Sequence, residues 1–514
     1  MSSTFYGLEI GKSGLFASQK TLEVIGNNIA NADTEGYTRQ RVNLSSVASY
    51  GGNCSWTPAD NAVVGCGVNI DGIQQIRNEY YDTQYRNQYA TLSDLSAKAK
   101  AYGSLETVLN ESSTTGVQTA LQTLYDDFQK LSGAADSKDI RTLVREDAKN
   151  VTDTFQYYSK QLVSLQDDQD KAINVSVNEV NDLVDEISKL NTQIGRCQVN
   201  NSNANDLLDK RNLALDKLSG YVDISYSEGD NRAVSIYMGK NKIDASKKDD
   251  YCLLDGSTGT AYKLTSTQNK ANYYGTADQY HNVTLVSKNG NTVNITGDSL
   301  TGGSLKGNFD NRDGDTDANP GIAHTLNQLD TLVRGIVSAY NEVHKNGYGI
   351  PSDDNGNVSK TNMNFFDDQN GDLTKVNANN FALSSDVLAS VNNIAASSQT
   401  VDLTATNTQK ANNENALKLV KVSTATNLGT IGSIDEYLQS MISSVAVASS
   451  HYTKLTSNQQ TIVDNITDSR QETSGVSTNE ETTNIIAAEK SFSAASHVIT
   501  TLNDMLDTLL NMVR

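Results

Sequence analysis

The stretch from residue 137 to residue 198 limits the possible folds more than any other feature of the chain. It contains no proline and a single glycine, Gly195. Apolar residues such as Val144, Val151, Leu162 and Ile187 recur along it at helical spacing. One helix of this length would span roughly 90 Å at 1.5 Å per residue, and helices beyond about 25 residues usually belong to coiled coils or rods. The sequence therefore predicts a mainly α fold, built as an elongated coiled-coil or helical bundle.

Heptad repeats of apolar residues predict a helix at each end of the chain. The predicted N-terminal assembly seam consists of Leu8, Leu15, Leu22, Ile25 and Ile29. Small residues beside this seam would let a partner helix approach closely. The predicted stripe of the last helix, about 479–513, consists of Phe492, Ile499, Leu502, Leu506, Leu509 and Val513. Each of these helices needs a helical partner, and the simplest arrangement is that the two pair with each other. The alternative is that both are ordinary amphipathic helices of a globular domain.

The interior of the chain predicts more helices and one all-β insert. Further helices are expected over about 75–110, 116–132, 321–346 and 412–470. After Gly220 the pattern changes to alternation of apolar and polar residues, and Asn289-Gly290 is a strong hairpin signal. We therefore expect a β module that projects from the rod on flexible glycine joints, at Gly220 and at Gly302-Gly303, and that is dispensable for assembly.

This layout predicts a nested domain organisation in which both chain ends fold together. The segment 347–410 is rich in Asn, Asp, Ser and Gly, so we expect mostly loop there, either as a separate segment or as part of an outer domain. The expected parts are a terminal coiled-coil domain (1–50 plus 474–514), an elongated helical rod (51–220 plus 303–346 plus 411–473), a β insert (221–302) and the loop-rich segment (347–410).

The charge of the chain argues against two classes of partner. The 61 acidic residues outnumber the 41 basic ones, for a net charge of −20. Such a surface repels phosphate backbones and anionic lipid headgroups, so we expect neither nucleic acid nor membrane as a partner. No apolar run is long enough for a membrane span, and the N-terminus has no cleavable secretory signal. By ordinary rules this would be a cytoplasmic protein.

The sequence offers little that could support catalysis, a metal or a cofactor. The run from Gly7 to Ser13 resembles a phosphate-binding loop, but its first glycine is missing and it lies in a predicted helix. The acidic turns 313–317 and 353–357 do not match a calcium loop, and the five histidines are isolated in sequence. Cys54 and Cys66 share one segment and could pair, although free thiols are the alternative. We expect no enzyme, no metal site and no cofactor.

Several motifs resemble one bacterial family. The segment 26–42, GNNIANADTEGYTRQRV, closely resembles the N-terminal signature of flagellar rod, hook and hook-associated proteins. The axial signature residues within it are Asn27, Asn28, Asn31, Gly36 and Tyr37. The last helix, with Glu480-Glu481 near its start, is also similar to the family. Three features are similar to the hook-associated members: YTRQ at 37–40, NDLLDKR at 205–211, and GGSLKG at 302–307 leading into a helix with AYNEVH at 339–344.

The resemblance implies a structural protein at the junction between the flagellar hook and the filament. It implies self-association in a helical ring, contacts with hook protein and with the next hook-associated junction protein, and an export chaperone. It also implies export through the flagellar type III apparatus to the extracellular flagellum, with only a transient stay in the cytoplasm, which replaces the cytoplasmic expectation. The alternatives are another axial protein, of the hook or the rod, and an enzyme or glycan-binding module in the central insert.

Overall fold

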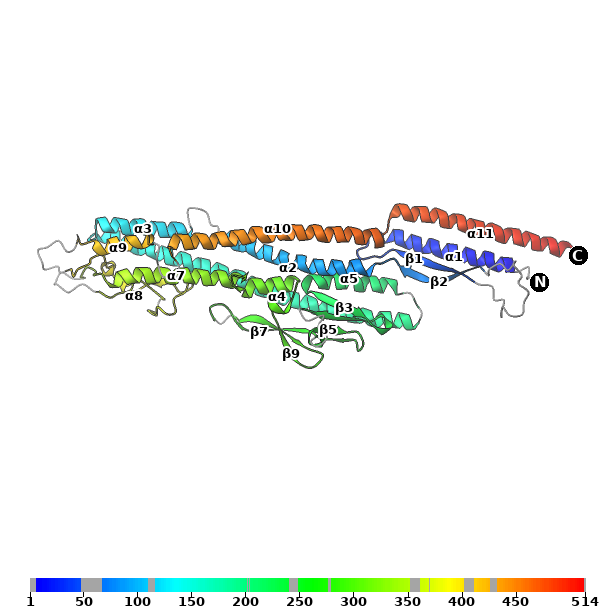
Figure 1. Ribbon diagram of the computed structural model, residues 1–514, viewed down its shortest axis with the longest axis horizontal. Coiled ribbons are helices and arrows are strands. Elements are labelled where there is room, and N and C mark those ends of the chain that lie inside the picture. Colours follow the sequence, from blue (N-terminus) through cyan, green and yellow to red (C-terminus); the bar gives the residue numbers. More distant parts are fainter. Residues whose placement is uncertain are drawn as a thin grey trace.

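The computed structural model shows a long, narrow molecule in which both chain ends lie at the same tip (Figure 1). The described residues are 6–47, 67–109, 116–200, 202, 204–239, 248–275, 279–351, 361–368, 370–401, 411–425 and 432–512. The structure is mainly helical, with long helices at both ends and small antiparallel sheets in the middle. This confirms the predicted fold class. Cys54 and Cys66 lie outside the described residues, and Cys197 and Cys252 are free thiols.

The rod is a bundle around one uninterrupted helix of 62 residues. Its helices are α2 (Glu79–Leu109), α3 (Val117–Gly133), α4 (Lys138–Val199), α7 (Ile322–Lys345), α9 (Glu414–Ser423) and α10 (Ile434–Ser474). The predicted single helix over 137–198 is confirmed by α4, which begins at Ser137, whose hydroxyl accepts a hydrogen bond from the Ile140 N–H. Its buried face repeats at three and four residues, so the helix extends as long as neighbours cover that face.

The loop-rich segment packs into the core of the rod at the end farthest from the chain termini (Figure 1). It contains the paired strands β12 (Phe366–Asp367) and β13 (Ala382–Leu383) and the short helix α8 (Ser385–Ala389). Its side chains Phe365, Phe366 and Phe381 are fully buried in one cluster with residues of α3, α4 and α7. The composition predicted mostly loop, and most of the described segment has no regular structure. It nevertheless supplies aromatic core.

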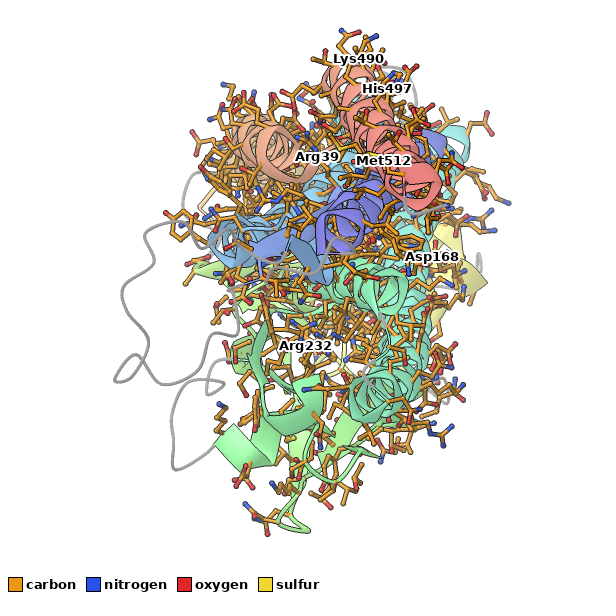
Figure 2. The ribbon with its side chains drawn as sticks, turned by 90° about the vertical axis from the view of Figure 1, so that its right-hand side faces the viewer. Arg39, Asp168, Arg232, Lys490, His497 and Met512 are labelled. Carbon is orange, nitrogen blue, oxygen red and sulfur yellow. The ribbon has the colours of Figure 1, made fainter. Side chains whose placement is uncertain are left out.

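The β insert holds two antiparallel sheets. One has the order β3 (Ile224–Glu228), β4 (Val234–Met238), β5 (Cys252–Asp255), β6 (Thr260–Ala261). The other has the order β7 (Leu264–Ala271), β8 (Gln279–Val286), β9 (Thr292–Ile295). The predicted turn lies between β8 and β9, where Gly290 has φ of +81°. Seen along the rod, the insert (green) projects to one side (Figure 2).

The insert is not joined to the rod by flexible glycines, and that expectation was wrong. Apolar residues of both sheets share one core with Ile173, Val180 and Ile187 of α4. At the flanks, the Gly303 N–H donates to the Ala90 carbonyl at 2.7 Å, and a Cβ on Gly303 would lie 2.3 Å from the Tyr221 carbonyl oxygen. These glycines therefore allow close backbone packing rather than motion.

Two helices went unpredicted as separate elements because their apolar patterns are weak. These are α5 (Asn205–Tyr221) and α6 (Ser304–Asp313). Each buries several polar side chains, among them Asp209 and Arg211 in α5 and Asp310 and Arg312 in α6. A two-stranded ribbon, β10 (Asp315–Thr316) with β11 (Asn319–Pro320), follows α6. Helices that bury ion pairs lack the apolar stripe on which sequence reasoning depends.

The terminal unit consists of α1 (Tyr6–Ala30), α11 (Thr478–Met512) and the hairpin β1 (Gln40–Ser46) with β2 (Val68–Gln75). The two helices lie side by side and the hairpin packs along α1 (Figure 1). The unit meets the rod where α10 ends at Ser474 and α11 begins. Lys490 and His497 are exposed on the outward side of α11 (Figure 2).

Candidate functional site: the terminal helix pair and its joint to the rod

Glycines bring α1 and α11 into close antiparallel contact. The nearest atoms to Gly7, Gly11 and Gly14 belong to residues that move backwards along α11, from Leu502 to Ile499 to Ala495. A Cβ placed on Gly7 would lie 3.1 Å from Leu502 Cδ1, and one on Gly11 would lie 2.9 Å from Ile499 Cγ1. The absence of side chains on this face therefore sets the distance between the two helices.

The partner helix lies beside the leucine seam rather than directly on it. Of the predicted N-terminal seam, Ile25 is buried, whereas Leu8, Leu15, Leu22 and Ile29 are half-buried. Small residues beside the seam were expected to let a partner helix approach closely, and Gly11 is one of the residues in contact with α11. Leu8 and Leu15 each follow a contacting glycine by one residue, which places them about 100° around the helix from that contact.

Most of the predicted C-terminal stripe faces α1. Phe492, Ile499, Leu502 and Leu506 are half-buried, and Leu509 is 50% exposed. Val513 lies outside the described residues. The buried residues of α11 are Glu481 and Ala488, so this helix keeps most of its surface uncovered.

The axial signature forms the turn between α1 and the hairpin. Asn28 is buried and bonds the backbone of Gln40 twice, with its Nδ2 donating to the carbonyl at 2.9 Å and its Oδ1 accepting from the N–H at 3.0 Å. Asn31 Nδ2 donates to the Asn27 carbonyl at 3.0 Å, which also accepts the Asn31 N–H at 3.1 Å, so the last turn of the helix is bonded twice. Gly36 has φ of +80°, which permits the turn.

Tyr37 completes this turn. Its hydroxyl donates to Asn28 Oδ1 at 2.9 Å and accepts from Asn27 Nδ2 at 3.3 Å. Burial, with added contributions from Asp206, Asp209 and Glu481, raises the pKa of the Tyr37 hydroxyl to about 12. The hydroxyl therefore stays protonated and remains a hydrogen-bond donor.

Arg39 connects the hairpin to α10 and to α11, where the rod meets the terminal unit. Its Nε lies 2.7 Å from Oε1 of the buried Glu481, and its Nη1 lies 2.8 Å from Glu480. Its N–H donates to the Ser474 carbonyl at 2.9 Å, at the last residue of α10. Arg39, which directly precedes β1, therefore fixes the crossing from α10 to α11.

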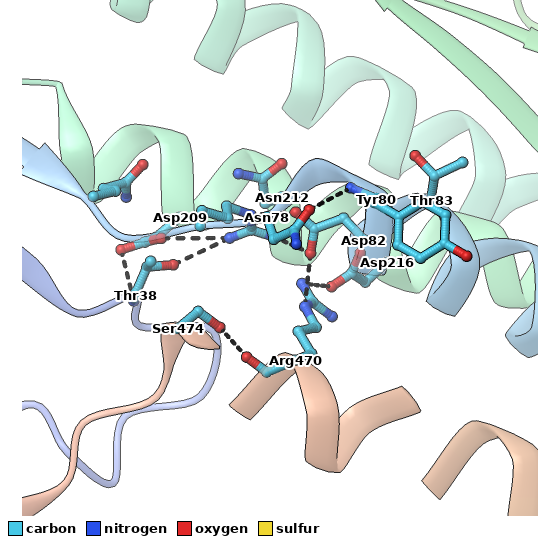
Figure 3. Close-up of polar contacts among 12 residues, drawn as sticks. Thr38, Asn78, Tyr80, Asp82, Thr83, Asp209, Asn212, Asp216, Arg470 and Ser474 are labelled. Carbon is cyan, nitrogen blue, oxygen red and sulfur yellow. Dashed lines mark hydrogen bonds and ion pairs between the residues drawn. The ribbon is translucent and has the colours of Figure 1, made fainter. Parts of the chain in front are cut away.

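The start of α5 forms the seat for the hairpin. Asp209 Oδ2 accepts from the Thr38 N–H at 3.1 Å (Figure 3), and Asn205 Nδ2 donates to Gln40 Oε1 at 3.1 Å. The Asn205 carbonyl in turn accepts from Gln75 Nε2 at 2.9 Å. Burial raises the pKa of the Asp209 carboxyl to about 6. The motif at 205–211 therefore carries out a structural task that its sequence alone did not reveal.

A cluster of ion pairs lies beneath this seat, and we call it the joint cluster: Arg77, Asp82, Arg86, Asp216 and Arg470. Arg470 Nε lies 2.7 Å from Asp82 Oδ1, and its Nη2 lies 2.6 Å from Asp216 Oδ2 (Figure 3). Arg86 Nε approaches the other Asp216 oxygen at 2.7 Å, and Arg77 Nε approaches Asp82 Oδ2 at 2.5 Å. The cluster joins α2, α5 and the last turns of α10, directly before the crossing to α11.

The electrostatics of the joint cluster keep Arg470 charged. Burial alone would lower the pKa of Arg470, but Asp216 and Asp82 reverse that effect, and the pKa is raised. The Arg470 guanidinium also stands 5.0 Å from the centre of the Tyr85 ring. Buried charges at this site are therefore paired, and the removal of one partner would leave another uncompensated.

The cluster also contacts the β insert. The Arg86 guanidinium stands 4.6 Å from the centre of the Tyr226 ring in β3. Farther along the insert, His281 Nδ1 lies 2.5 Å from Asp170 of α4, and Arg312 Nη1 of α6 lies 2.5 Å from the same side chain and donates to the His281 carbonyl at 2.8 Å. The insert is thus fixed to the rod by polar contacts as well as by its shared core.

The remaining candidate sites have structural partners. Within the part of the chain that the structure describes, no group of three or more His, Cys, Asp or Glu could hold a metal ion. In the acidic turn at 313–317, Asp313 pairs with Arg312 and with Lys270, while 353–357 lies outside the described residues. The run resembling a phosphate loop lies within α1. Among the described helices, none combines the length and apolar character needed to cross a bilayer.

Comparison with known families identifies the chain. The model of the flagellar hook-associated protein FlgK helical domain matches residues 102–366, more than half of the chain. The chain belongs to the FlgK family. Models of flagellar basal body rod proteins match the ends of this FlgK family member, at residues 8–38 and 468–512. The protein is therefore a structural component of the flagellum, of a family that is not an enzyme family, and it associates with other axial proteins.

Relatives of this FlgK family member carry one name. Flagellar hook-associated protein 1 of Bacillus subtilis (strain 168) is 29% identical over 99% of both chains. The protein of the same name from Salmonella typhimurium is 28% identical over 68% of this chain, which spans only 57% of that relative's length. A solved FlgK from Burkholderia pseudomallei, titled a flagellar hook junction protein, is 14% identical and shares the fold with a TM-score of 0.56, covering 77% of this chain and 100% of that one.

Proposed function

We propose that this FlgK family member forms the junction between hook and filament by self-assembly. The observation that carries the proposal is the terminal unit. The two segments that match rod-protein models, 8–38 and 468–512, lie together as one antiparallel pair at one tip of the molecule. The relative that aligns over 99% of both chains is named flagellar hook-associated protein 1, which supports the same position.

The proposed partners follow from this position. The terminal unit, made of α1, the hairpin β1–β2 and α11, associates with neighbouring copies in a helical ring. Hook protein contacts the ring on one side, and the next hook-associated junction protein contacts it on the other. The rod and the β insert (221–302) form the outer parts of the junction, and the segment 347–410 belongs to the rod.

Immuno-electron microscopy of purified flagella tests the position. Antibodies against the β insert are expected to label a short zone at the distal end of the hook. Labelling along the whole hook or in the rod would contradict the proposal and favour a hook or rod protein instead. A strain that lacks the gene provides the control for antibody specificity.

We further propose that the chain leaves the cell through the flagellar type III apparatus, with α11 held by an export chaperone before export. Phe492, Ile499, Leu502 and Leu506 lie on one side of α11, at successive spacings of seven, three and four residues, as in helices that bind in apolar grooves. The same side contacts α1 in the folded chain. The chaperone and α1 therefore compete for one surface.

Calorimetric titration of the chaperone tests this competition. Leu502→Asp with Leu506→Asp is expected to weaken chaperone binding at least tenfold, because two buried anchors of this size contribute about 1.5–3 kcal/mol each. Thr500→Asp with Thr508→Asp is the matched control, since both threonines are exposed on α11. Equal affinity of the two double variants would show that the chaperone binds elsewhere.

A further inference from the structure

Helix α11 continues well past the start of α1. Gly7 lies against Leu502, and α11 extends ten residues further, to Met512. We call residues 505–512 the α11 tip. Its exposed apolar side chains are Met505 (59%), Leu509 (50%), Leu510 (68%) and Met512 (78%). Together with the half-buried Leu506 they form a wide apolar stripe opposite Asp507 and Asn511, and an apolar stripe of this width normally packs against a partner.

The same terminal unit contains an apolar groove. A cavity of about 520 Å³ lies between α1, α11 and the hairpin, and we call it the terminal groove. Small and apolar side chains form its walls, among them Ala17 and Val24 of α1, Val42 of β1, and Ala487 of α11. Arg39 and Arg41 also line it, and Arg41 is exposed.

Tip and groove are complementary in charge as well as in apolar character. The end of α11 carries Asp504 and Asp507, and no lysine or arginine occurs from 491 to 512. At the groove wall, Arg39 is already paired with Glu480 and with Glu481, so Arg41 is the positive charge that would meet this acidic end. Such complementarity fixes the register of two surfaces more than it adds affinity.

We propose that the α11 tip of one copy of this chain occupies the terminal groove of a neighbouring copy. The inference rests on the proposed function, because a junction built by self-assembly requires such contacts. Tip and groove belong to the same helix, about 20 residues apart, so neighbours would be displaced by about 30 Å along its axis. A head-to-tail contact of two different surfaces generates rings or helical arrays, as a junction needs.

Disulfide cross-linking in assembled flagella tests the contact. In a background without the four native cysteines, Met505→Cys combined with Ala487→Cys is expected to give covalent multimers in multiples of 55.5 kDa. Their yield should exceed that of either single variant at least tenfold. The matched control combines Met505→Cys with Glu489→Cys, since Glu489 is exposed on α11 and outside the groove. Co-expression with the chain that lacks all four cysteines supports incorporation of the variants.

The outcomes separate this inference from the proposed function. Label at the distal end of the hook, without cross-links between positions 505 and 487, would overturn the inference and leave the function standing. Equal cross-linking in the Glu489 control, or a product with another protein, would also overturn it. Label elsewhere in the flagellum would contradict the proposed function itself.

Charge reversal supplies a second readout. Asp504→Arg with Asp507→Arg is expected to reduce incorporation into flagella at least tenfold, and Arg41→Asp in the same chain should restore part of it. Circular dichroism of the purified variants verifies that they fold. Failure of Arg41→Asp to restore any incorporation of a folded variant would count against the contact.

Discussion

Single residues at the terminal unit act mainly through the space they leave or the charge they pair. Gly11 has no side chain where Ile499 approaches, and Arg470 joins two buried aspartates directly before the α10–α11 crossing. His344, in the core of the rod, uses both ring nitrogens in hydrogen bonds. Each of these roles leads to a prediction that can be tested by one substitution.

Gly11→Leu is expected to separate α1 from α11. Even the Cβ would lie 2.9 Å from Ile499 Cγ1, and overpacking typically costs about 1–3 kcal/mol. Hydrogen exchange of α1 amides should accelerate. Gly26→Leu is the matched control, since nothing lies within 4 Å of that position, and it should stabilise α1 by up to about 1 kcal/mol through helix propensity. The same response in both variants would contradict the close contact.

Arg470→Met is expected to destabilise the joint by about 2–4 kcal/mol, because Asp82 and Asp216 would lose a partner in a mostly buried site. Hydrogen exchange should show lost protection in the hairpin and at the start of α5. Lys454→Met, an exposed position on the same helix, is expected to change neither. Unchanged protection in Arg470→Met would show that the ion pairs do not hold the joint.

His344 is expected to make the rod sensitive to acid. Its Nδ1 donates to the Met363 carbonyl and its Nε2 accepts from the Ala395 N–H, and burial lowers the pKa of the imidazole to about 4. The unfolded chain, with a pKa near 6.5, binds the proton first, so the contribution of His344 is complete above pH 6.5 and declines as pH falls to 4. The loss reaches roughly 3 kcal/mol.

Denaturant titrations between pH 7.5 and 4 measure this effect. His344→Gln should be less stable at pH 7.5, because it cannot keep both hydrogen bonds, but its stability should fall less steeply below pH 6.5. Parallel pH profiles for wild type and variant would contradict the assignment.

At the scale of elements, the β insert and α4 depend on each other. Sequence analysis predicted a dispensable insert, but Ile173, Val177, Val180 and Ile187 of α4 are buried in the core that both share. The insert also covers the joint cluster through Tyr226. Its removal therefore exposes an apolar face rather than a finished surface.

Deletion of residues 222–302 is expected to lower the yield of soluble protein and the stability of the chain. The deletion can be made because Tyr221 and Gly303 are adjacent and can be joined. The exposed face of α4 would favour aggregation. Calorimetry and light scattering of the purified variant measure both effects. A monomeric variant that melts at the wild-type temperature would show that the insert is dispensable after all.

At the scale of the molecule, stability is distributed unevenly along the rod. The rod and the insert each hold a large buried cluster, whereas the buried residues of α11 are Glu481 and Ala488. Segments with few buried apolar contacts open most readily. In the proposed assembly, the terminal unit is thus the part of the chain that would gain most stability from neighbouring copies.

Limited proteolysis is expected to trim 1–30 and 480–514 first in the monomer and to spare them in assembled flagella. The reason is that single helix pairs gain little stability until their remaining faces are covered. Mass spectrometry of the fragments identifies the cut sites. Equal resistance of both ends in a proven monomer would contradict this prediction.

The sequence by itself determined the helices with a clear apolar stripe, the hairpin in the insert and the family, because periodicity, turn chemistry and short motifs are local properties. The continuous α4 and the turn at Gly290 follow from patterns within a few residues. The stripe of α11 was visible in the same way.

Only the tertiary structure decided which faces meet. That α11 rests on Gly7, Gly11 and Gly14 depends on the space between two helices at opposite ends of the chain. The helices α5 and α6 lack a clear apolar stripe because they bury ion pairs, whose partners lie far away in sequence, as Asp216 and Arg470 do. Pairing of buried charges and close packing at glycine are non-local, and a single sequence contains no period that reports them.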